Sequence, residues 1–150
     1  MQFAQIKNIN GYEYIFKPSG IVGLRVEPGA SGKNTTHVIG ILNAPLEVAD
    51  APQKVLDNLG ITKEFAKLTG AYGEVWIRTE SISVFNTAYG TDRSDLSRSQ
   101  TMIYASGSPF KVYEDVETIK TMLGIGVSPP VAAAVSMAVS RSTKKRPKRS

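Results

Sequence analysis

The chain contains a second copy of its own sequence pattern. Residues 3–22, aligned without a gap on residues 65–84, share six identities in twenty positions, and residues 44–61 aligned on residues 108–125 share five in eighteen. The offset is 62 in the first block and 64 in the second, which places a two-residue insertion between them, in the polar stretch 87–100 where a loop would absorb it. An internal repeat of this length restricts the fold to two similar units in tandem.

Short apolar and β-branched runs separated by turn residues indicate that each copy is mostly β. Asn10-Gly11 is a strong hairpin signal, and Asp50, Pro52 and Gly60 bound a short helix with Asp50 as its expected N-cap. We predict an α+β, mostly β fold of two tandem modules, each a five-stranded antiparallel meander closed by a short helix. The strands expected in the first module are residues 3–9, 12–16, 21–26, 35–42 and 46–48.

The composition changes after the second copy. Ser128 followed by two prolines can begin a helix, and a small apolar run predicts that this helix covers residues 128–140. It is too short to span a bilayer, so we expect it to dock on a protein partner through Val131, Val135 and Val139. The predicted divisions of the chain are 1–61 for the first module, 62–125 for the second, 126–140 for the C-terminal helix and 141–150 for a basic tail.

The first copy also carries a family pattern over residues 6–59, in Ile9, Asn10, Gly11, Tyr14, Phe16, Pro18, Ile21, Leu24, Thr36, Val38, Asn43, Val48 and Val55. This pattern resembles the small β-module of the FlbD/SwrD family of short flagellum-associated proteins, which also turns up in small bacteriophage proteins. The resemblance implies the fold and offers no catalytic residue to transfer. Because the chain is doubled and adds a basic tail, we expect a phage-encoded protein rather than a flagellar one. The second copy, over residues 68–123, lacks the Asn-Gly turn and the proline but keeps Gly73, Trp76, Gly107, Val112 and Ile119.

Positive charge is concentrated at the C-terminal end. Of the 18 lysines and arginines, six lie in the last ten residues, so residues 1–140 hold 12 basic against 13 acidic side chains. The tail has no apolar residue with which to fold, and such a segment normally neutralises phosphates without reading sequence. We expect it to bind nucleic acid or another polyanion through Arg141, Lys144, Lys145, Arg146, Lys148 and Arg149. A tail that serves only solubility is the alternative.

The residues for catalysis are scarce. The chain has no cysteine and one histidine, His37, which excludes thiolate and multi-histidine metal sites. The stretch 29–34 resembles a phosphate loop, but its glycine spacing is too short and a strand is expected after it, so we interpret it as a hairpin loop. No paired acid and base or nucleophile motif appears, and we predict no enzyme activity, no metal and no cofactor.

Aromatic side chains offer a second mode of nucleic-acid contact. Tyr12, Tyr14 and Phe16 alternate on one expected strand, and Trp76 matches Tyr14 in the second copy. Aromatic residues on one face of so small a sheet usually form its core, so we expect only Tyr12 and Tyr89 to be exposed for base stacking.

Two functions of different kinds fit these features. The first is a non-enzymatic nucleic-acid-binding protein in which the modules form a rigid platform for the basic arm. The second is a structural or assembly protein, such as a virion component or adaptor, whose helix and arm dock on a partner subunit. Exposed sheet edges would favour a homo-oligomer. With no secretion signal or membrane span in the sequence, we expect a cytoplasmic or virion location, or a nuclear one in a eukaryotic host.

Overall fold

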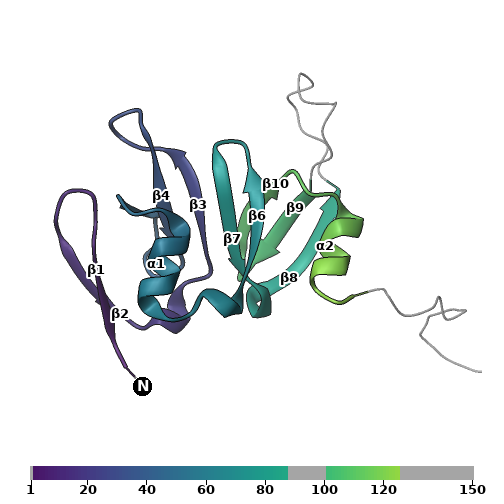
Figure 1. The fold of residues 1–150 in the computed structure, drawn as a ribbon, viewed down its shortest axis with the longest axis horizontal. Coiled ribbons are helices and arrows are strands. Elements are labelled where there is room, and N and C mark those ends of the chain that lie inside the picture. Colours follow the sequence, from purple (N-terminus) through teal and green to yellow (C-terminus); the bar gives the residue numbers. More distant parts are fainter. Residues whose placement is uncertain (1, 88–100, 126–150) are drawn as a thin grey trace, which may run out of the picture. The chain divides into compact units, whose positions relative to one another are not determined.

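The computed structural model describes residues 2–87 and 101–125 (Figure 1). These residues fall into two compact units divided after Val116. The first unit contains every described strand and the first helix. The second begins at Glu117 and contains most of the second helix.

Strands dominate the described residues, together with two α-helices, and this confirms the prediction of a mostly β protein. Three short 3-10 turns connect them: η1 (Pro18–Gly20), η2 (Thr62–Glu64) and η3 (Thr79–Ser81). The first half consists of β1 (Ala4–Lys7), β2 (Glu13–Phe16), β3 (Gly23–Pro28), β4 (Asn34–Ile39), β5 (Leu46–Val48) and α1 (Pro52–Leu59). The second half consists of β6 (Phe65–Gly70), β7 (Gly73–Arg78), β8 (Ile82–Thr87), β9 (Thr101–Ala105), β10 (Ser108–Val112) and α2 (Val116–Met122).

The strands within the described ranges form three antiparallel sheets. Their orders are β1-β2, β5-β4-β3-β7-β6 and β10-β9-β8. The strands of neither half form the single five-stranded meander that we predicted. The reason is that β7 occupies the edge of β3 where β2 was expected, with Gly23 opposite Ile77 and Leu24 opposite Trp76. Figure 1 shows this central sheet, in which strands from both halves lie side by side.

Helix α1 begins one residue later than the sequence indicated. Its N-cap is Ala51, whose methyl side chain cannot accept a hydrogen bond, so the prediction of Asp50 as N-cap is wrong. Asp50 instead forms an ion pair with Lys54, and its carbonyl accepts a hydrogen bond of 2.6 Å from the Thr36 hydroxyl. The predicted end is confirmed, because Gly60 follows the helix with φ of 72°, a left-handed conformation that glycine adopts without strain.

The hairpin of β1 and β2 covers one side of a hydrophobic core. Side chains alternate between its two faces, as the pleat of a strand requires. On the inner face Ala4 lies opposite Phe16 and Ile6 opposite Tyr14, and all four pack on the core. The core itself is a continuous cluster of buried residues from both halves: Phe16, Ile21, Leu24, Val38, Leu46, Val48, Val55, Leu56, Phe65 and Trp76.

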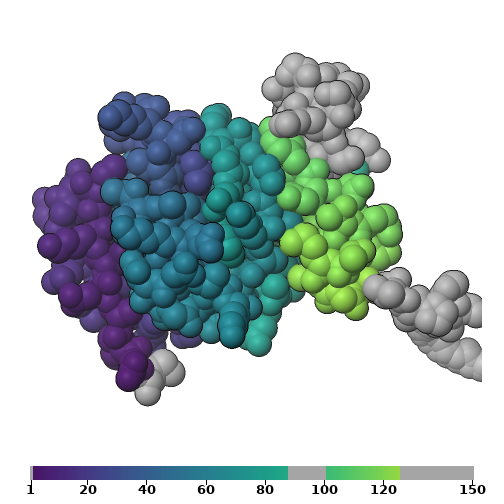
Figure 2. All heavy atoms as spheres, viewed as in Figure 1, coloured from purple at the N-terminus to yellow at the C-terminus, as the bar shows by residue number. Residues whose placement is uncertain are grey.

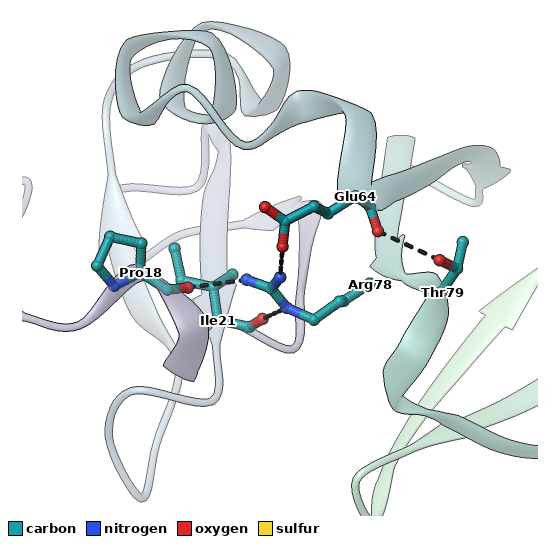
Figure 3. A network of polar contacts seen from close by, with 5 residues as sticks. All are labelled: Pro18, Ile21, Glu64, Arg78 and Thr79. Carbon is teal, nitrogen blue, oxygen red and sulfur yellow. Dashed lines mark hydrogen bonds and ion pairs between the residues drawn. The ribbon is translucent and has the colours of Figure 1, made fainter. Parts of the chain in front are cut away.

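A buried arginine holds the two halves together beside this core. Arg78, the last residue of β7, donates from Nε to the Ile21 carbonyl and from Nη2 to the Pro18 carbonyl, each at 2.8 Å (Figure 3). Its Nη1 donates to the carboxylate of Glu64, and its guanidinium lies 4.7 Å from the centre of the Phe65 ring. One forked side chain thus fixes β7 against the η1 turn and uses donors that a lysine could not supply together.

We expect Arg78→Met to lower the free energy of unfolding by about 2 to 4 kcal/mol, because it removes hydrogen bonds to two backbone carbonyls, leaves the buried Ile21 carbonyl without a donor and leaves Glu64 without its ion-pair partner. Urea unfolding followed by Trp76 fluorescence measures the change. Lys54→Met is the control, because Lys54 forms an exposed ion pair with Asp50 at 3.5 Å and its loss should cost under about 1 kcal/mol. Equal losses in the two variants would contradict the role given to Arg78.

Candidate functional site

Most of the residues predicted to bind a partner lie outside the described ranges. This holds for the six basic residues between Arg141 and Arg149, for Val131, Val135 and Val139, and for Tyr89. The structure places Tyr12, the remaining predicted stacking residue, at the turn between β1 and β2, where 67% of it is exposed. Phe16 and Trp76 belong to the core as expected, and Tyr14 packs against it.

The turn that presents Tyr12 is organised by one side chain. Asn8 Oδ1 accepts hydrogen bonds from the backbone N–H groups of Asn10 and Tyr12, each at 2.9 Å. Gly11 has φ of 87°, so the Asn10-Gly11 signal in the sequence correctly marks the turn. The aromatic ring therefore projects from a turn of defined geometry.

The outer face of the β1–β2 hairpin exposes two large apolar side chains, Phe3 and Ile15, among polar ones that include Gln5, Lys7 and Glu13. Ile15 is 60% exposed and Phe3 is 62% exposed, and the ammonium of Lys17 lies 5.6 Å from the centre of the Phe3 ring. In Figure 2 the residues of this hairpin, in purple, form the surface of one flank. Sequence reasoning missed this face, although Ile15 was a signal for it, since it lies between the inward-facing Tyr14 and Phe16 and so had to point outward.

A second apolar surface lies on the sheet of the other half. Val84 on β8 is 50% exposed and stands opposite Tyr104 on β9. Within the described residues β8 pairs only with β9, so its other edge presents unpaired backbone groups. Exposed apolar side chains next to an open strand edge are typical of a surface that adds another strand.

One polar cluster on β4 and β5 contains the residue types of a hydrolase site. The Thr35 hydroxyl donates to Glu47 Oε2 at 2.7 Å and lies 3.3 Å from His37 Nε2. A nucleophilic triad needs the carboxylate to orient the histidine, whereas here the carboxylate accepts directly from the hydroxyl. The cluster therefore lacks the arrangement of a nucleophilic triad and is a set of polar contacts on the sheet surface. Among the described residues no group of three His, Asp or Glu side chains could hold a metal ion.

An open groove of about 380 Å³ lies between β1, the end of β5 and α1. Its lining mixes apolar side chains such as Ile6 and Leu59 with the exposed polar groups of Lys7, Asp50 and Asn58. These polar groups do not converge on one buried position, so the groove lacks the set of polar contacts that would orient a bound small molecule. The glycine-rich stretch 29–34 is a hairpin loop between β3 and β4, as predicted, in which the Gly29 N–H donates to the Lys33 carbonyl at 2.8 Å.

The charges of the described residues are largely balanced. Ion pairs join Arg25 with Glu27, Lys54 with Asp50, Lys67 with Glu74, Arg78 with Glu64, and Lys120 with Glu117. Local pairing of this kind leaves no large field of one sign for a polyanion. Any strong attraction to nucleic acid therefore has to come from residues beyond these ranges.

Comparison with known proteins finds no matching family model, no matching curated protein and no matching solved structure. No helix among the described residues has the length and apolar character needed to cross a membrane.

We expect Asn8→Ala to loosen the turn that carries Tyr12, because two backbone N–H groups lose their acceptor, at a cost of about 1 kcal/mol. Hydrogen exchange should be faster for the amides of β1 and β2, with little change in β6 and β7. Asn10→Ala is the matched control in the same turn, and its exchange should stay near that of the wild type. Unchanged exchange in Asn8→Ala would contradict the assignment.

Proposed function

We propose that this protein is a non-enzymatic, phage-encoded nucleic-acid-binding protein that grips the phosphate backbone with its basic C-terminal residues. The observation that carries the proposal is the separation of charge: six of the 18 cationic side chains lie in the last ten residues, while residues 1–140 are nearly neutral. A concentrated run of lysine and arginine binds phosphates with strong salt dependence and without base specificity. The β-rich first unit serves as a rigid platform, with Tyr12 available for stacking on an unpaired base.

The described structure supports this division of labour. Five of its cationic side chains are held in ion pairs within the protein. The others lie apart on the surface: Lys7, Lys17, Lys33, Lys63 and Lys111. Such a body adds little to phosphate binding, which favours the tail as the binding element.

We further propose that the chain is a tandem duplication of a FlbD/SwrD-like module of five strands closed by a helix. The helix ends support it, since Gly60 and Gly124 share φ of 72° and donate to the carbonyl three residues back in each case. The strands support it too, since the hydroxyl of Thr36 donates to the Asp50 carbonyl at 2.6 Å and that of Thr101 to the Glu114 carbonyl at 2.7 Å. Each module is then a hairpin followed by a three-stranded meander.

The registers revise the alignment of the two copies. Lys7 pairs with Glu13 across the first hairpin, and the corresponding pair in the second is Thr69 with Glu74, so the second turn is one residue shorter. On this proposal the offset of 62 holds for β1 and β6 and becomes 61 for β2 and β7 and for the η1 and η3 turns that follow them. By this register Tyr14 corresponds to Val75 and Ile15 to Trp76, in place of the gapless match of Tyr14 with Trp76.

A structural or assembly role is the second candidate. The observation that favours it is the exposure of large apolar side chains in two places, Phe3 and Ile15 on the first hairpin and Val84 and Tyr104 on β8 and β9. In this reading the predicted helix over residues 128–140 and the tail dock on a partner subunit or another acidic surface. It predicts no nucleic-acid binding at low salt.

The test is fluorescence anisotropy with labelled single- and double-stranded DNA and RNA across a salt series, using the full chain. In the tail variant, Lys144, Lys145, Arg146, Lys148 and Arg149 are changed to Gln. We expect its log–log salt slope to be shallower by roughly 4, at ~0.7 to 0.9 per lost contact, with weak binding that remains.

The control variant removes charges from the body at Lys7, Lys33, Lys63 and Lys111. All four are exposed and outside the ion pairs, so its affinity should stay within about threefold of the wild type. Equal loss in the two variants would place the phosphate contacts on the body. Absence of binding by the unmodified chain at low salt would overturn the proposed function and favour the assembly role.

A further inference from the structure

The junction between the two halves provides a template for a contact that one chain cannot complete. In the described residues β3 pairs with β4 on one side and with β7 on the other. Strand β8, which follows η3 as β3 follows η1, pairs only with β9. Strand β2, which precedes η1 as β7 precedes η3, pairs only with β1. Each half thus has a hairpin that can add to a neighbouring sheet, the donor hairpin, and a strand edge that can receive one, the acceptor edge. Among the described residues, the donor hairpin β1–β2 and the acceptor edge of β8 have no such partner.

The outer face of the β1–β2 hairpin carries a cation next to an aromatic ring, as the corresponding face of the β6–β7 hairpin does. On the second hairpin, Arg78 precedes η3 and its guanidinium lies 4.7 Å from the Phe65 ring centre. On the first, Lys17 precedes η1 and its ammonium lies 5.6 Å from the Phe3 ring centre. An aromatic ring and a cation thus meet in the same way on both outer faces.

The two faces differ in what covers them. Trp76, two residues before Arg78, is 5% exposed because it lies opposite Leu24 of β3 and belongs to the core of the first half. Ile15, two residues before Lys17, is 60% exposed. The outer face of β1 and β2 is therefore an uncovered equivalent of a face that is buried in the second hairpin.

The free edge of β8 also resembles the edge of β3 that pairs with β7. Leu24 lies opposite Val38 and is fully buried, and Phe85 lies opposite the fully buried Ile103 in the same position of β8 and β9. Phe85 remains half-buried, since no hairpin covers it as Trp76 covers Leu24. The acceptor carbonyls of Pro18 and Ile21 correspond to those of Thr79 and Ile82, because each pair consists of the first residue of a 3-10 turn and the residue that follows the turn.

We propose that the occupant of both surfaces is a second copy of this chain, which repeats the β3–β7 junction between molecules. Strand β2 of one copy pairs antiparallel with β8 of the next, so that Ile15 lies opposite Phe85 and Tyr14 opposite Asn86. Lys17 then reaches the Thr79 and Ile82 carbonyls of the neighbour. This inference rests on the proposed duplication and not on nucleic-acid binding.

The contact between copies is weaker than the internal one. Lysine supplies one ammonium where Arg78 supplies a fork of donors. Val84 stands where β3 has Gly23, whose missing side chain lets the Phe110 ring and the Trp76 carbonyl approach to within 2.7 Å of a Cβ position. The strands have to separate slightly at Val84, next to the bulge that β8 carries between Ile82 and Val84. We therefore expect assembly to depend on protein concentration.

Because the two surfaces are different, the contact is head-to-tail, and repetition gives a closed ring or an open filament rather than a two-fold dimer. Sedimentation velocity of the full chain over a concentration series, at a salt concentration that removes nucleic acid, should show species larger than two copies of the 16.2 kDa chain. A monomer at all concentrations would overturn the proposal and leave the nucleic-acid test unaffected.

Two variants test which surfaces meet. Ile15→Lys blocks the donor hairpin and Val84→Lys blocks the acceptor edge, so each alone should sediment as a monomer. An equimolar mixture should form a complex of two chains, because one intact hairpin and one intact edge remain, and its formation also shows that both variants fold. Leu42→Lys, at a residue 45% exposed between β4 and β5, is the control and should assemble like the wild type.

Other outcomes contradict the head-to-tail contact. Self-association of either single variant to the wild-type extent would exclude its surface from the interface. If both variants are monomeric and folded by circular dichroism but fail to combine, the two surfaces do not bind each other.

Discussion

The pairing of β7 with β3 is the interaction on which the rest of the first unit depends. It merges strands of both halves into one sheet and buries Trp76 in the core of the first half. Arg78 secures the pairing, because its guanidinium donates to the carbonyls of Pro18 and Ile21 at the η1 turn. Separation of the halves would expose an indole ring and leave the Ile21 carbonyl and the guanidinium without these hydrogen bonds, so the two halves are expected to unfold together.

Local structure was predictable from the sequence where local chemistry decides it. Glycines at the Asn10-Gly11 turn and after α1 determine backbone angles by themselves, and alternation identifies strands wherever one face is buried. The sequence did not predict which strand pairs with β3, because β2 and β7 could each form hydrogen bonds with the same backbone groups of β3. That choice depends on the long-range burial of Trp76 and Arg78, and single-sequence patterns do not contain it.

The residues of the candidate site also differ in whether the sequence predicts them. The exposure of Tyr12 was predicted although the residue was assigned to a strand, and the structure places it in the turn before β2 instead. The exposure of Ile15 was not predicted. The basic tail is evident from composition alone, because charge needs no fold to attract phosphates. A polyanion-binding tail and a self-associating body would act together, since an assembly presents one tail for each copy and several weak contacts combine into a strong one.

The short connection between the halves has a further consequence. Only residues 60 and 61 separate α1 from η2, so the tether keeps the second hairpin near β3 at an effective concentration in the millimolar range. The internal junction therefore closes in every folded molecule, however dilute. Two halves on separate chains would have to form this contact by collision, whereas the covalent connection makes its formation a first-order process that does not depend on protein concentration.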